Sequence, residues 1–228
     1  MAVNSLTRSN LLQTRLRGLS FLSLEKSREA VVTPVETLNN LLPEGGLRAG
    51  SFVEILSQEA GGAGSRDGAG SGSGAYSLAL TLARQALPRR EAWAVVDSEG
   101  TFYPPAAAAM GYDLKRLILL RPRSDEDAWA FTQLLRSADI SVSFWMTSRM
   151  DNMVFRRLQL AAERGDGLGF VMRPAAAERK PSWASLRLMA SWRSASGQRR
   201  LCACVLHAAG RFVPPNGKGG AREVEIAL

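Results

Sequence analysis

Short apolar runs alternate with amphipathic stretches over the middle of the chain. The apolar runs have the length of strands and occupy residues 51–56, 93–100, 116–122, 140–146 and 168–174. The stretches between them carry apolar residues at helical spacing, at residues 76–87, 105–111, 125–138 and 152–165. Strands that alternate with helices predict an α/β fold with a mostly parallel sheet flanked by helices on both faces.

The pattern changes after Pro174. Residues 185–192, 199–212 and 223–228 have the pattern of consecutive strands, and NGKGG at residues 216–220 marks a turn before the last of them. We therefore expect an antiparallel, β-rich extension over residues 174–228 that completes one domain of residues 31–228.

Residues 1–30 precede this domain and predict an N-terminal helix or arm. Within it, Leu12, Leu16 and Leu19 recur at helical spacing. Two interpretations stay open. The leucines can pack on the protein's own core, or they can form an arm that docks on a partner.

The sequence GAGSGSGAYSLAL at residues 68–80 stands between a predicted strand and a predicted helix, as a phosphate-binding loop does. Its candidate nucleotide-binding residues are Gly70, Gly72, Ser73, Gly74 and Ser77. A working loop has a lysine for the β- and γ-phosphates and a hydroxyl for magnesium. Ala75 and Tyr76 stand at those positions, so we expect weak or no binding of ATP and magnesium. We interpret residues 57–74 as a flexible Gly/Ser loop, with a functional phosphate cradle as the alternative.

Acidic residues follow one predicted strand and are missing after another. Glu99 follows the strand at residues 93–100, where a general base for an attacking water could stand, or a merely solvated strand end. The strand at residues 140–146 ends in Met146 and Thr147 instead of an acid that could hold magnesium. We therefore assign no catalytic residue with certainty and keep Glu99 as a vestigial candidate.

The formal net charge of +8 favours an acidic partner, such as nucleic acid or an acidic protein face, although a solvated basic surface is equally consistent with it. Candidate DNA contacts lie at and after the fifth strand: Arg173, Arg179, Lys180 and Trp183. Cations next to a stacking aromatic residue are typical of single-strand binding sites. The alternative is a basic surface loop with Trp183 packed on the core.

Metal, membrane and export functions find no support in the sequence. Cys202, Cys204 and His207 lack a fourth ligand and the usual spacing of a zinc site. We therefore expect no metal. The sequence has two unpaired cysteines, no apolar run of membrane-spanning length and no signal-peptide pattern, so it predicts a cytoplasmic protein.

Several longer segments together resemble the RecA superfamily over nearly the whole chain. They are LNNLLPEGGLRAGSFVEIL, VVDSEGTFYPPAAAAMGYDLKRLILLRP and CVLHAAGRFVPPNGKGGAREVEIAL. The first matches the approach to the phosphate loop of RecA, and the second places Glu99 at the catalytic glutamate. Within the superfamily, DEDAWAFTQLLRSADISVSFWM and FRRLQLAAERGDGLGFVMRP resemble the ImuA family.

This resemblance implies a RecA-like accessory protein of error-prone translesion DNA synthesis in the SOS response. The implied partners are an ImuB-like inactive Y-family polymerase homologue, an error-prone replicative-type DNA polymerase, RecA and single-stranded DNA. The expected function is a non-catalytic adaptor. The alternatives are a weak residual ATPase and a SulA-like cell-division inhibitor, against which the full set of C-terminal strands argues.

Overall fold

The structure is a computed structural model that describes residues 30–42, 44–57, 74–89, 91–123, 125–148, 150–195, 198–209 and 223–226. The predicted arm with Leu12, Leu16 and Leu19 lies outside these residues, as do Gly70, Gly72 and Ser73 of the predicted phosphate loop. Nothing in the structure therefore tests the interpretation of either segment.

The described elements alternate as the hydrophobic pattern predicts. The strands are β1 (Ala30–Val31), β2 (Leu47–Arg48), β3 (Phe52–Ser57), β4 (Ala92–Val96), β5 (Leu117–Leu120), β6 (Ile140–Met146), β7 (Leu168–Pro174), β8 (Leu186–Ala195), β9 (Gln198–Ala208) and β10 (Glu223–Ile226). The helices are α2 (Glu36–Asn39), α3 (Ala75–Ala83), α4 (Pro104–Ala109), α5 (Asp127–Arg136) and α6 (Asn152–Gly165), with short 3₁₀ turns η1 (Arg84–Arg89), η2 (Leu114–Arg116) and η3 (Ala175–Arg179).

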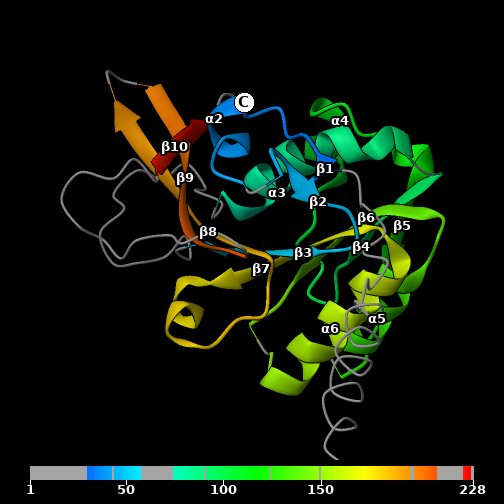
Figure 1. Cartoon of the computed structure of the whole chain (residues 1–228). Helices are drawn as coiled ribbons and strands as arrows, with labels where there is room; N and C mark the ends of the chain where they lie inside the picture. Colours follow the sequence, from blue (N-terminus) through cyan, green and yellow to red (C-terminus); the bar gives the residue numbers. More distant parts are fainter. Residues whose placement is uncertain are drawn as a thin grey trace, which may run out of the picture.

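Eight strands form the main sheet in the order β10-β9-β8-β3-β7-β6-β4-β5 (Figure 1). All neighbours from β8 to β5 are parallel, whereas the pairs β8–β9 and β9–β10 are antiparallel. The predicted fold class is confirmed, including the antiparallel C-terminal extension. The extension joins the parallel part because β8 pairs in parallel with β3 in the middle of the sheet.

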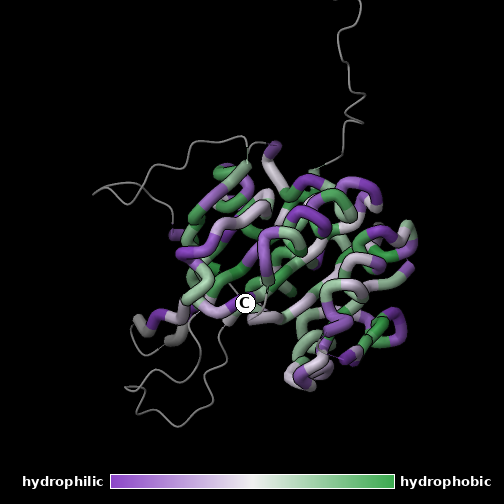
Figure 2. The backbone as a smooth tube through the Cα atoms, turned by 90° about the horizontal axis from the view of Figure 1, so that it is seen from below, coloured by the Kyte–Doolittle hydropathy of each residue, from purple (hydrophilic) through white to green (hydrophobic). Residues whose placement is uncertain are grey.

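Helices cover the two faces of the sheet (Figure 1). Along β3, Val53 and Ile55 join the core on the α3 side, whereas Phe52 joins the core on the side of α5 and α6. This alternation follows from the strand period of two, and complete burial on both faces explains why β3 is nearly all apolar. Figure 2 shows helices that carry hydrophobic and hydrophilic segments in turn, as expected for helices with one face on a sheet.

The predicted helix at residues 76–87 ends earlier than its apolar pattern suggests. Helix α3 stops at Ala83, and η1 continues as a 3₁₀ turn that contains Pro88. Proline lacks the amide hydrogen that an α-helix needs, and it disfavours the helical conformation of the preceding residue. The tighter turn therefore replaces the last turn of the predicted helix.

Candidate functional site

The candidate site lies at the carboxyl edge of the parallel strands, where ligands bind in open α/β sheets. Helix α3 begins there, and its N-cap residue Gly74 has a φ of +72°. A Cβ atom at Gly74 would lie 2.8 Å from Leu201 Cδ1 and 2.9 Å from Trp192 Nε1. Only glycine fits both the conformation and the space. The hairpin of β8 and β9 therefore packs directly against the start of α3.

Tyr76 occupies the first turn of α3, at the position where the phosphate-loop pattern calls for a magnesium-holding hydroxyl. Its ring packs on Phe102 with a centroid distance of 5.6 Å. Its hydroxyl is buried and has no hydrogen-bond partner among the described residues. Burial, followed by the negative charges of Asp97 and Glu99, raises the pKa of Tyr76. The phenol therefore stays neutral and is a poor ligand for a hard cation such as magnesium.

Asp97 at the end of β4 is engaged in structural contacts. Its Oδ1 accepts hydrogen bonds from the backbone amides of Thr101 at 2.7 Å and Phe102 at 3.1 Å. Its Oδ2 lies 3.4 Å from Arg121 Nε. These contacts fix the turn that presents Phe102 to Tyr76. Glu99 lies exposed on the same turn, and its carboxylate is the candidate for a general base that the sequence indicated.

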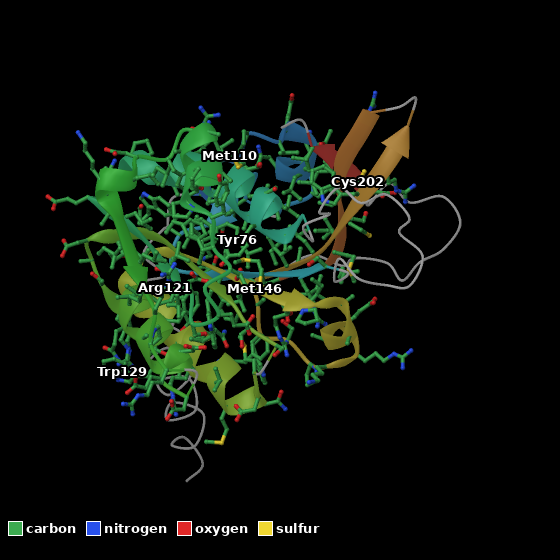
Figure 3. All side chains as sticks on the ribbon, turned by 180° about the vertical axis from the view of Figure 1, so that it is seen from behind. Tyr76, Met110, Arg121, Trp129, Met146 and Cys202 are labelled. Carbon is green, nitrogen blue, oxygen red and sulfur yellow. The ribbon has the colours of Figure 1, made fainter. Side chains whose placement is uncertain are left out.

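The end of β6 presents no carboxylate. Met146 packs against the α3-side core, as Tyr76 does, and Thr147 is buried with its amide bonded to the carbonyl of Met172. Asp151, the next acid, accepts a hydrogen bond from Val154 N at 2.7 Å and caps α6. Figure 3 shows Tyr76 and Met146 near the middle of the molecule and Arg121 nearer its periphery.

The residues described at this edge do not fit a magnesium nucleotide of the kind that RecA-like chemistry uses. The start of α3 offers Gly74, Ala75, Tyr76 and Ser77, without a cationic side chain. Ser77 accepts a hydrogen bond at its backbone carbonyl from Thr81 Oγ1, at 2.8 Å. Thus, among the described residues, the start of α3 offers no cation for a phosphate and the end of β6 offers no acid for a metal.

The structure separates the predicted DNA contacts into an interior residue and surface residues. The prediction that Arg173 contacts DNA is wrong, because its side chain is fully buried and its Nη1 lies 2.7 Å from Glu54 Oε1. It therefore cannot present its guanidinium to a phosphate. Arg179 and Lys180 are exposed at the end of η3 and just after it. Trp183 is 50% exposed, so it is not simply packed in the core.

Arg156 on α6 belongs to this surface, although no pattern in the sequence indicates it. Its Cζ lies 5.8 Å from the centroid of the Trp183 ring. A guanidinium at that distance over an indole is a cation–π contact, which holds the exposed ring in place. We call Arg156, Arg179, Lys180 and Trp183 the basic aromatic patch. Arg156 lies more than twenty residues before the others in the sequence, so its contact with Trp183 depends on the fold.

Glu54 was also missed, although the sequence carried a signal for it. An acid in the middle of the apolar run SFVEIL must be paired if the run is a buried strand. In the structure Glu54 is fully buried and contacts Arg173 on β7 and Arg187 on β8. The partners lie more than a hundred residues away, which is why the pairing could not be read from spacing.

The cysteines lie on β9, in the antiparallel extension. Cys202 is buried, and burial raises the pKa of its thiol. Among the described residues, no group of three or more His, Cys, Asp and Glu residues could hold a metal ion. In the same part of the chain, each helix is too short or too polar to cross a bilayer.

Comparison with known proteins places the chain near RecA. It is 30% identical over 115 residues to the RecA proteins of Chlorobium limicola and Chlorobium chlorochromatii. The match covers 50% of this chain and 29% of each RecA, so the chain spans less than a third of the length of these relatives. No family model matches the chain. The similarity and the sheet order together support a RecA-like relationship.

Proposed function

We propose that this RecA-like chain is a non-catalytic adaptor in error-prone translesion DNA synthesis during the SOS response. It binds polymerase partners and single-stranded DNA in the cytoplasm. The observation that carries the proposal is Tyr76, whose partly buried ring packs on Phe102 at the position where the phosphate-loop pattern calls for a metal-holding hydroxyl. A site that has exchanged its charged groups for packed aromatic rings is suited to holding shape rather than to transferring phosphate.

Loss of the chemistry follows from the charge that transfer requires. Phosphoryl transfer depends on cations that stabilise the charge developing on the phosphate. The sequence offers Ala75 at the lysine position and Met146 and Thr147 at the end of β6, while Asp97 is engaged with Arg121 and the turn amides. Glu99 alone could orient a water, but it would have no polarised phosphate to act on.

The basic aromatic patch supports the DNA-binding part of the proposal. Arg179 and Lys180 supply exposed positive charge for phosphates, and the half-exposed ring of Trp183 supplies a stacking surface for a base. Stacking of one base on an aromatic residue is worth about 1–3 kcal/mol. Neutralisation of phosphates makes such binding fall with salt, by about one unit of slope for each phosphate contact.

The test is the salt dependence of binding to a fluorescent single-stranded oligonucleotide. The double variant Arg179→Ala/Lys180→Ala should bind more weakly and with a salt slope lower by about one to two units. The matched control is Lys115→Ala/Arg123→Ala, which removes two exposed cations beside the edge strand β5, whereas η3 joins the more central strands β7 and β8. Equal slopes for the wild type and the Arg179/Lys180 variant would remove the patch from the proposal.

The polymerase partners are tested by co-purification. The intact chain should retain an ImuB-like polymerase homologue or an error-prone replicative-type polymerase, and RecA in the presence of single-stranded DNA. Deletion of residues 1–24 should weaken this retention while the fold persists, as judged by its circular dichroism spectrum and melting temperature. A truncated chain that unfolds would instead assign the arm a structural role.

A further inference from the structure

Three charged side chains meet inside the sheet, beneath the segment that carries the basic aromatic patch. Glu54 on β3 lies between Arg173 on β7 and Arg187 on β8. Arg173 Nη1 is 2.7 Å from Glu54 Oε1, and Arg187 Nε is 2.7 Å from Glu54 Oε2. The side chains of Glu54 and Arg173 are fully buried and that of Arg187 is 10% exposed. We call these three residues the buried ion triad.

Arg187 extends the triad to the backbone of η3. Its Nη2 donates a hydrogen bond to the carbonyl of Ala177 at 2.6 Å, and its Nη1 donates to the carbonyl of Glu178 at 3.0 Å. These two carbonyls immediately precede Arg179 and Lys180. One guanidinium thus joins the central strands to the segment that presents the two exposed cations.

The geometry requires arginine. Arg187 donates its two terminal nitrogens to two successive carbonyls, as the rigid fork of a guanidinium allows, while its Nε lies in ion-pair contact with Glu54 without a hydrogen bond. A lysine would keep the charge near Glu54 but has one nitrogen and could not bridge all three oxygens. Glu54 in turn fixes the direction of the Arg187 fork from below.

We infer that Arg187 is a positioning residue for nucleic-acid binding, which holds η3 so that Arg179 and Lys180 stand ready beside Trp183. The inference rests on the proposed binding of single-stranded DNA. Without the anchor, the two cations remain on the chain and still reach phosphates, but the segment must be ordered at the moment of binding. Loss of the anchor therefore weakens binding without lowering the number of phosphate contacts.

Arg187→Lys tests this with two readouts that differ from those of a lost phosphate contact. Its affinity for a fluorescent oligothymidylate should fall about tenfold, which corresponds to about 1.4 kcal/mol, while the salt slope stays that of the wild type. Trypsin should cleave it faster after Arg179, because the released segment becomes a substrate. Lys180 precedes Pro181 and is a poor trypsin site, so the new cut identifies the segment. The control is Arg193→Lys on the same strand, whose side chain is 64% exposed and pairs with Glu223.

A third measurement needs no variant and keeps the inference testable if Arg187→Lys folds poorly. In the wild-type chain, the amide of Lys180, which bonds to the carbonyl of Ala177, should exchange its hydrogen as slowly as amides of β8. Rapid exchange there, or unchanged affinity and cleavage in a folded Arg187→Lys, would overturn the inference. Absence of DNA binding by the wild type would overturn the proposed function instead, while cleavage and exchange still report on the anchor.

Discussion

Removal of the Glu54 charge should be among the most destabilising single changes in this protein. Glu54→Gln keeps the shape of the side chain but leaves Arg173 and Arg187 buried without a negative partner. One guanidinium would also face the amide hydrogens of the new side chain, donor against donor. Loss of one partner of a buried ion pair costs about 3–5 kcal/mol. A domain is stabilised by only about 5–15 kcal/mol in total.

Urea denaturation followed by circular dichroism measures this cost. The control is Glu225→Gln, since Glu225 contacts Arg200 with both side chains about half exposed. Such surface pairs contribute about 0–1 kcal/mol. The triple change Glu54→Leu/Arg173→Met/Arg187→Leu should recover stability, because it removes the buried charges together. If Glu54→Gln lowers the free energy of unfolding by less than about 1 kcal/mol, as expected for its control, then the triad is not a buried, water-excluded ion pair network, and the reasoning fails.

Three further changes test the packing and the titration of buried groups. Gly165→Ala should destabilise the domain by more than about 2 kcal/mol, because its Cβ would lie 1.8 Å from the carbonyl oxygen of Leu135. The control Gly100→Ala has open space around it and should cost only about 1 kcal/mol for its positive φ. Equal losses of stability for the two variants in urea denaturation would contradict this reasoning. Burial raises the pKa of Tyr76 and Tyr112 above 10.0. Their contribution to stability should therefore be constant below pH 10.0 and be lost above it, as the phenols ionise in the unfolded chain, and the loss should be less steep in Tyr112→Phe. Alkylation of the Cys202 thiol at neutral pH should be slower in the folded than in the unfolded chain, because its raised pKa lowers the thiolate fraction, and mass spectrometry can follow it.

Most of the fold could be predicted because it follows from the local periodicity of hydrophobic residues. Strand-length apolar runs between amphipathic stretches gave the parallel sheet, and the loss of that alternation after Pro174 gave the antiparallel extension. Gly165 shows where local rules mislead. A glycine at the end of a helical pattern commonly takes the left-handed C-terminal position, but here Asp166 adopts that conformation, and Gly165 is needed for the close approach to Leu135.

The site was harder to predict because its contacts join distant parts of the chain. The sequence indicated the missing lysine at Ala75 and the unusual Tyr76, but not that Tyr76 packs on Phe102. It also gave no sign that Trp192, on the C-terminal hairpin, lies against Gly74. Arg173 was misplaced for the same reason, since a cation at the end of a strand looks exposed until its buried partner is known.

The central proposal is that the RecA-like scaffold of this protein serves binding and does not turn over ATP. Isothermal titration of the full chain with ATP and magnesium, with and without single-stranded DNA, tests it most directly. The proposal predicts no saturable binding of ATP at millimolar concentration and no release of phosphate. Saturable binding, with phosphate release that Glu99→Gln abolishes, would contradict it and would make Glu99 the base of a working ATPase.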